Sequence, residues 1–267
     1  MFSIIDCDED LIYFQEDLDK LHHWSQPNLM DFNTKKCKSI RITRKQEPFT
    51  NIVHMNDTIL KEVKEFKNLG ILTDCSLSRN SHTDMITAKA NRMLGLIKNT
   101  CKDLKDKATL KTLFCSLLRS NLEYCSVVWS PFTKRNIDKL ERIQRRATKF
   151  ILKSNDQYDI RLRELNLLTL EQRRFLFDVT FLFKALSGYM DVDFSQFLDF
   201  YCQEDRYSFR HFDNRSLKKR FARTNVLKNS FFHGIVDKWN ILPYEIPSAS
   251  NVYIFKSKVM RFLLQCK

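Results

Sequence analysis

Residues 137–153 repeat apolar and basic side chains with the period of an α-helix. At about 3.6 residues per turn, the apolar side chains share one face, made of Ile137, Leu140, Ile143, Ala147, Phe150 and Ile151. The basic side chains share a narrow stripe on the other face, made of Arg142, Arg145, Arg146, Lys149 and Lys153. This pattern predicts a helix that packs on one side and presents positive charge on the other, either to solvent or to an anionic partner.

The charge of the chain is distributed unevenly along the sequence. The net charge is +13, yet residues 1–19 carry a net charge of −7, which leaves +20 for the rest. Residues 134–153 alone carry +6. This distribution favours a polyanionic partner for most of the chain, because cations that neutralise phosphates release condensed counterions. No window of about 18 or more uncharged apolar residues exists, so no membrane partner is expected.

The sequence predicts an α+β fold that is mostly α-helical, because it has only 4 Gly and 5 Pro among 267 residues and long segments of helical periodicity. A small antiparallel β element is expected at about residues 38–75, with strands at 38–43, 50–54, 58–60 and on either side of Gly70. A bundle of helices is expected to follow it. The predicted helices lie at 10–24, 81–101, 106–120, 137–153, 169–186, 230–239 and after Ser250. Asp106 and Ser250 are candidate N-caps, Thr169 and Gln172 form a candidate capping box, and Gly188 stands where a C-terminal cap is expected.

Cysteines and acidic residues provide no clear metal site. The eight cysteines form no CxxC pair, and no histidine lies at zinc-ligand spacing from a cysteine. The N-terminus lacks the basic and apolar regions of a signal peptide, so we expect reduced thiols and a cytoplasmic or nuclear protein that is not secreted. The acidic cluster at residues 6–10 is compatible with a divalent cation, but acidic residues are also favourable at a helix N-terminus, which is the simpler interpretation.

A second basic segment spans residues 206–228 and carries a net charge of +7. Its aromatic residues alternate with the charges, at Tyr207, Phe209, Phe212 and Phe221. Guanidinium groups that meet phosphates and rings that stack on bases are typical of single-strand binding. The candidate contacts are Lys218, Lys219, Arg220 and Arg223. The alternative is a basic extended connector whose aromatic side chains pack on neighbouring helices.

The sequence contains the segments LEYCSVVWSP and LERIQRRATKFI, one after the other. Their order and approximate spacing resemble the region after the palm in reverse transcriptases of non-LTR retrotransposons of the jockey-like kind. The resemblance extends from about Phe2 to Phe262, through EDLDKLHHWSQPNLMDFNTKKCKSI, FKNLGILTD, RTNVLKNSFFHGIVDKWNILP and VYIFKSKV. It implies a remnant of the palm end with primer-grip-like strands at 1–78, thumb-like helices with the basic helix at 79–155, and a C-terminal helical region at 156–267.

The resemblance also implies roles for individual residues. Lys36 matches a lysine near the phosphates of the incoming nucleotide, although a solvated lysine at a strand edge is the favoured interpretation for this chain, which has no metal site beside it. Phe66, Leu69 and Gly70 match the primer-grip turn. The basic helix, with Arg142, Arg145, Arg146 and Lys149, would lie along template or primer. The implied partner is RNA, DNA or an RNA–DNA hybrid, bound through its phosphates.

Polymerases of this family use two Mg²⁺ ions held by a YADD-type aspartate pair and a third aspartate upstream. The sequence contains no such pair, and the resemblance would place it a few residues before Met1. We therefore expect no catalytic residue, metal site or cofactor in this chain, and nonspecific nucleic-acid binding without polymerisation. The alternatives are a part of an active polymerase whose upstream half is missing here, and a helical protein-interaction module. Unpaired strand edges at 38–75 also predict self-association.

Overall fold

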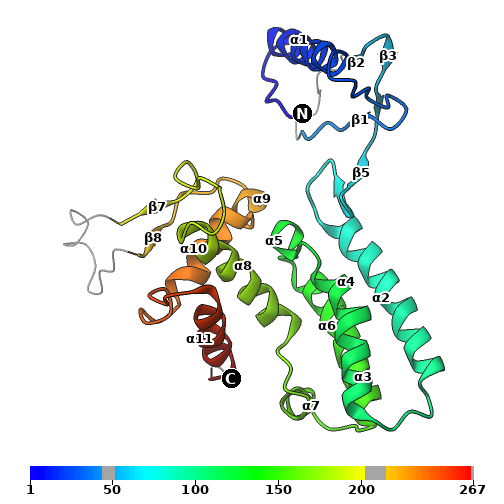
Figure 1. Cartoon of the computed structure of the whole chain (residues 1–267), viewed down its shortest axis with the longest axis vertical. Coiled ribbons are helices and arrows are strands. Elements are labelled where there is room, and N and C mark those ends of the chain that lie inside the picture. The colour runs from blue at the N-terminus through cyan, green and yellow to red at the C-terminus, as the bar shows by residue number, and fades with distance from the viewer. Residues whose placement is uncertain (44–51, 202–214, 266–267) are drawn as a thin grey trace. The chain divides into compact units, whose positions relative to one another are not determined.

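The computed structural model describes residues 1–43, 52–201 and 215–265. The chain forms two compact units, Met1–Ser81 and His82–Lys267 (Figure 1). Helices make up most of the described residues, and the strands form small two-stranded sheets. The predicted α+β fold with mostly α-helical structure is therefore confirmed.

The first unit is built on helix α1 (Asp8–Ser25). Asp8, Glu9 and Asp10 of the acidic cluster form the first turn of this helix, and the carboxylate of Asp10 accepts the backbone N–H groups of Asp6 and Cys7 at 2.8 and 3.0 Å. Leu18 packs on the hairpin of β2 (His54–Met55) and β3 (Thr58–Ile59), and this small core consists of Leu18, Met55 and Leu60 with half-buried Phe14, Leu21, Cys37 and Val53 around it. The acidic residues thus serve the helix N-terminus, as the simpler interpretation predicted.

The strands of the first unit differ in part from the predicted antiparallel element. The hairpin β2–β3 and the hairpin of β5 (Glu65–Asn68) and β6 (Ile71–Asp74) are antiparallel, as expected. However, β1 (Lys38–Ser39) pairs in parallel with β4 (Lys61–Glu62), and the pairs form separate sheets. The strands of each hairpin pair only with each other, so the strand pairs do not combine into one larger sheet. The predicted strand at 38–43 ends at Ser39, and residues 50 and 51 of the next lie outside the described residues.

The second unit begins with helices whose buried side chains are mainly leucine, isoleucine and alanine, together with Phe114 and Trp129. The elements are α2 (Asn80–Thr100), α3 (Lys107–Leu113), the π-helix η1 (Phe114–Arg119), α4 (Ser120–Glu123), α5 (Ser126–Trp129) and α6 (Lys134–Leu152). Asp106 caps α3 as predicted, because its carboxylate accepts the N–H groups of Ala108 and Thr109 at 3.1 and 3.0 Å. The predicted helix at 106–120 is interrupted by η1, whose wider turn the periodicity did not indicate.

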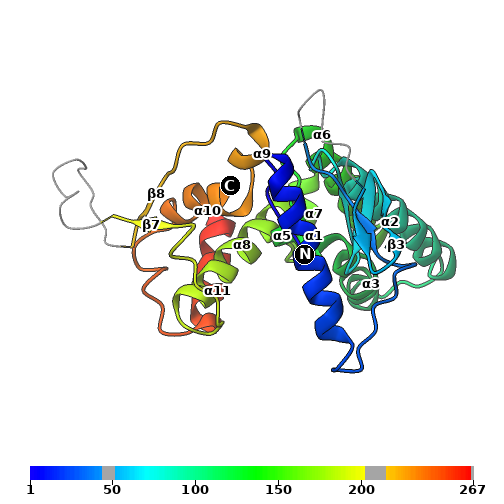
Figure 2. The ribbon, with the colours of Figure 1, turned by 90° about the horizontal axis from the view of Figure 1, so that it is seen from above.

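The C-terminal part of the second unit packs around α8 (Leu170–Leu186). Its other elements are α7 (Tyr158–Glu164), β7 (Asp199–Phe200), β8 (Leu217–Lys218), α9 (Asn225–Lys228), α10 (Phe231–Asn240) and α11 (Val252–Gln265). In two views α8 lies between α10 and α11 on one side and α5 on the other (Figures 1 and 2). The ring of Phe183 on α8 stacks on Phe255 of α11, with 4.2 Å between centroids.

Local signals in the sequence fix the ends of these C-terminal helices. Thr169 and Gln172 form the predicted capping box of α8, and Gly188 has the positive φ of 71° that suits the end of a helix. At α11 the cap is Asn251 rather than Ser250, since the Oδ1 atom of Asn251 accepts the N–H of Ile254 at 2.9 Å.

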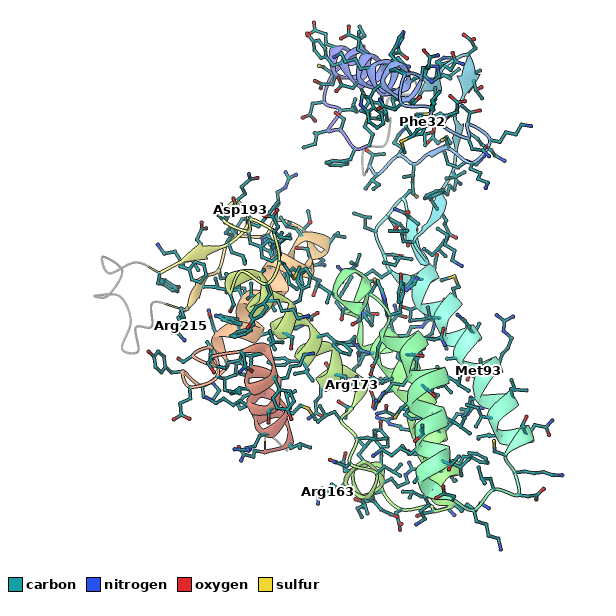
Figure 3. The ribbon with its side chains drawn as sticks, in the orientation of Figure 1. Phe32, Met93, Arg163, Arg173, Asp193 and Arg215 are labelled. Carbon is teal, nitrogen blue, oxygen red and sulfur yellow. The ribbon has the colours of Figure 1, made fainter. Side chains whose placement is uncertain are left out.

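Arg173 joins α8 to α4, because its Nη2 donates to Glu123 at 2.8 Å (Figure 3).

Candidate nucleic-acid interface

Helix α6 separates apolar from basic side chains as the sequence predicted. Leu140, Ile143, Ala147 and Ile151 are buried, whereas Ile137 and Phe150 are half-buried. The side chains of Arg142, Arg145, Arg146 and Lys149 are all exposed. Lys153 follows the helix with a φ of 51°, at its C-terminal cap. We call the four exposed cations the α6 basic face.

Glu141, an acidic residue of the same helix as the α6 basic face, is buried, so its carboxylate does not lie among the exposed cations. Its carboxylate accepts a hydrogen bond from the Tyr158 hydroxyl and another from the Leu170 backbone N–H, the latter at 3.0 Å. Burial raises the pKa of Glu141 above its ordinary value, and these hydrogen bonds and the nearby Arg174 oppose the shift. The net charge of residues 134–153 calculated from the sequence includes Glu141, but this carboxylate is buried in the structure.

Two arginines of the α6 basic face are held by neighbouring side chains. The guanidinium carbon of Arg145 lies 5.2 Å from the ring centroid of Tyr158. Arg146 donates through Nη1 to the Oδ1 atom of Asn91 on α2 at 2.8 Å. A cation that is already held in place loses less conformational entropy when it binds a phosphate.

Helix α2 adds a cation that the sequence did not assign to the site. The ammonium group of Lys98 lies 5.8 Å from the ring centroid of Phe150 on α6. Its pKa is lowered by burial and then by the positive charges of Arg146 and Lys149. The periodicity of α2 only placed Lys98 away from the apolar face of its own helix. Its proximity to α6 depends on how the two helices pack, which the sequence pattern does not determine.

The four candidate residues of the first unit lie in turns and on a hairpin. Lys36 is exposed, in a turn where its backbone N–H donates to the Asn33 carbonyl oxygen at 2.9 Å. Phe66 is exposed on β5. Leu69 and Gly70 form the two-residue turn between β5 and β6, with φ values of 46° and 89°. Phe66, Leu69 and Gly70 thus come together in one hairpin, whereas Lys36 belongs to a different turn.

The second basic segment uses several of its charges within the unit. Arg220 donates through Nε and Nη2 to both carboxylate oxygens of Asp199 at 2.7 and 2.9 Å. This pairing raises the pKa of Arg220 and lowers that of Asp199. Lys219 forms an ion pair with Asp237 at 2.5 Å.

These contacts tie the segment to its neighbours through charged groups, not through the packed aromatic side chains of the alternative interpretation. The ammonium group of Lys218 lies 5.6 Å from the Tyr201 ring centroid, and Arg223 is exposed. Phe221 is also exposed, while Tyr207, Phe209 and Phe212 lie outside the described residues. Phosphate contacts by Lys218, Lys219, Arg220 and Arg223 stay a prediction.

Residues 1–43, 52–201 and 215–265 contain no group of three or more His, Cys, Asp or Glu side chains arranged to hold a metal ion. The residues present therefore do not fit the two-Mg²⁺ centre that the resemblance implies, and we derive no step through a metal. Within the same described part, no helix has the length and apolar character needed to span a membrane.

Comparison with known protein families, curated proteins and solved structures finds no match for this chain. The resemblance to reverse transcriptases therefore rests only on the sequence segments quoted above.

Proposed function

We propose that this chain binds the phosphate backbone of nucleic acid through the α6 basic face, as the thumb-like part of a non-LTR retrotransposon reverse transcriptase. The observation that carries the proposal is the separation of charge on α6: its four basic side chains are exposed together while Glu141 is buried. The order of the segments that resemble this family supports the same assignment.

The geometry of the α6 basic face suits contacts to several phosphates. Arg142 and Lys149 are seven residues apart, so they lie about 10 Å from each other along the helix axis. Duplex DNA presents about one phosphate per 1.7 Å of its axis, so several phosphates lie within reach of the face. Arginine binds phosphate oxygens in a bidentate manner, and such backbone contacts do not depend on sequence. The binding is therefore nonspecific.

Polymerisation is not part of this proposal. The sequence contains no YADD-type pair, and a two-metal polymerase needs such carboxylates to activate the primer hydroxyl and stabilise the leaving group. Primer extension by the purified chain in Mg²⁺ or Mn²⁺ would contradict this part of the proposal.

The test is binding of the full chain to a labelled primer-template and to a single strand across a salt series. We expect the affinity of the wild-type chain to fall steeply with salt. The double variant R142Q/K149Q should reduce the slope of log affinity against log salt by about 1 for each lost phosphate contact. The matched control is K256Q/R261Q, which removes two exposed cations from α11 in the same unit and should keep the wild-type slope.

Two results would contradict the proposal. A nearly flat salt dependence of the wild-type chain would exclude phosphate contacts and favour the helical protein-interaction module. Equal slopes for R142Q/K149Q and K256Q/R261Q would mean that net charge, rather than the α6 basic face, determines binding.

A further inference from the structure

Three cations from two helices converge near the C-terminal ends of α2 and α6. Lys98 belongs to α2, whereas Arg146 and Lys149 belong to α6. The contact of Lys98 with the Phe150 ring and the hydrogen bond from Arg146 to Asn91 both join these two helices. Asn91 lies seven residues before Lys98, two helical turns away on the same side of α2. Lys98 and Arg146 are therefore held at the seam between the two helices, and Lys149 lies next to Phe150 in the sequence of α6.

The charge along this seam changes from balanced to positive. Near the beginning of α2, Asp84 forms an ion pair with Lys139 of α6. Asp84, Asn91 and Lys98 follow one another at intervals of seven residues on α2. Within the described parts of the chain, no carboxylate forms an ion pair with Lys98, Arg146 or Lys149. The end of the seam thus gathers cations without an anion to balance them.

This arrangement is unfavourable without a ligand. Burial and then the positive charges of Arg146 and Lys149 lower the pKa of Lys98, so both neighbouring cations disfavour the charged form of this lysine. An oxyanion between them would replace repulsion with attraction. The remaining N–H groups of the Arg146 guanidinium and the two ammonium groups provide donors from several directions, as a phosphoryl group with several oxygens requires.

We propose that Lys98, Arg146 and Lys149 form a site for a single phosphoryl group, which Lys98 completes from α2. Lys98 thereby extends the α6 basic face across the seam. The inference rests on the proposed function for the origin of the phosphoryl group. The first test uses inorganic phosphate alone and is independent of the proposed function.

The first test is thermal unfolding of the full chain in sodium phosphate and in sodium chloride at matched ionic strength. The variant K98M removes the charge but keeps an apolar side chain against Phe150. The control K89M removes an exposed lysine nine residues earlier on α2, which places it on the opposite side of the helix. Phosphate stabilises proteins in general by exclusion from their surface, so the difference between K98M and K89M is the relevant measure.

We expect phosphate to raise the Tm of wild type and K89M by a saturable amount that K98M lacks. In chloride the Tm of K98M should equal or exceed that of wild type, because the substitution removes repulsion. The exposed variant K149M should show a reduced phosphate effect with unchanged folding. Equal phosphate effects in wild type, K89M, K98M and K149M would overturn the site.

The second test identifies the source of the phosphoryl group with a single-stranded oligonucleotide, made with and without a 5′-phosphate. If the site takes a terminal phosphate, the 5′-phosphate increases the affinity of wild type and K89M severalfold but not that of K98M. If it takes an internal phosphodiester, K98M weakens binding of both oligonucleotides by the same factor. Wild-type affinity of K98M for both would overturn the site as part of the nucleic-acid face. A phosphate effect without any oligonucleotide binding would support the site and refute the proposed function.

Discussion

Leu69 occupies the first position of the turn between β5 and β6, and its backbone has a φ of 46°. Gly70 follows with a φ of 89°, so both residues of the turn have the positive φ of a type I′ hairpin. A leucine in this conformation costs roughly 1–2 kcal/mol, and its side chain is 82% exposed, so burial offsets little of that cost. The sequence predicted the turn from Gly70 and gave no sign of the strain at Leu69.

The substitution Leu69→Asn should stabilise the β5–β6 hairpin by about 1 kcal/mol, because asparagine tolerates positive φ far better than leucine. The control Leu69→Ala should bring no comparable gain, since alanine lacks the short polar side chain that lets asparagine hydrogen-bond locally at positive φ. Hydrogen exchange of the hairpin amides measures the effect locally. Equal protection in the two variants would contradict the argument.

The same variant tests the role that the resemblance implies for Leu69. If the exposed leucine contacts a primer-template, L69N weakens binding while it stabilises the hairpin. These effects have opposite signs, so loss of structure cannot account for the loss of binding. Unchanged affinity would remove Leu69 from the candidate contacts.

At the scale of elements, α6, α7 and the start of α8 are joined by one buried polar network. Glu141 accepts from Tyr158 and from the Leu170 N–H, while Gln144 donates through Nε2 to the Tyr158 hydroxyl oxygen and the Leu168 carbonyl at 2.9 and 3.0 Å. Burial and the charge of Glu141 raise the pKa of Tyr158. The hydroxyl therefore stays protonated and remains a donor. Glu141 and Gln144 belong to α6, Tyr158 belongs to α7, Leu170 begins α8 and Leu168 lies just before it.

The substitution Glu141→Leu should destabilise the second unit by roughly 3 kcal/mol at neutral pH. It leaves the Leu170 N–H and the Tyr158 hydroxyl buried without an acceptor, and each such group costs about 1–3 kcal/mol. Tyr158→Phe should cost only about 1 kcal/mol, because it keeps the ring beside Arg145 and removes one donor. Urea unfolding of both variants checks this order of effects. A Y158F variant less stable than E141L would contradict it.

The raised pKa of Glu141 gives the network a direction of pH dependence. The folded chain holds this proton more tightly than the unfolded chain. Protonation of Glu141 therefore contributes fully to the free energy of unfolding below the pKa that Glu141 has in the unfolded chain. This contribution is lost as pH rises through the pKa that Glu141 has in the folded chain. Glu141→Gln should remove this decrease, so the free energies of unfolding of wild type and E141Q should converge as pH falls.

These elements show which parts of the structure a sequence pattern can predict. Three features were predicted: the separation of apolar and basic faces on α6, the Asp106 cap, and the Thr169–Gln172 capping box. Each depends on residues within a few positions of one another. The burial of Glu141 depends on Leu170, which is 29 residues away. The position of Lys98 likewise depends on the packing of α2 against α6. Periodicity within one helix contains no information on such partners.

The whole molecule consists of two units with very unequal cores. The first unit buries Leu18, Met55 and Leu60 with a few half-buried neighbours, whereas the C-terminal core of the second alone contains sixteen buried residues. A small domain with so little buried apolar surface is marginally stable. The second unit, in contrast, contains the α6 basic face and Lys98, so the proposed interface does not require the first.

A chain shortened to residues 79–267 should therefore fold on its own, because it keeps α2 from its first residue and the whole core of the second unit. We expect one cooperative thermal transition and the salt dependence of the α6 basic face. Any affinity for primer-template that the full chain has in addition would then measure what Lys36 and the β5–β6 hairpin contribute.

The shortened chain also lacks the two-stranded sheets of the first unit, whose edges leave backbone groups unpaired. Light scattering should therefore find it monomeric where the full chain associates, and association of both chains to the same extent would place the self-contact in the second unit instead.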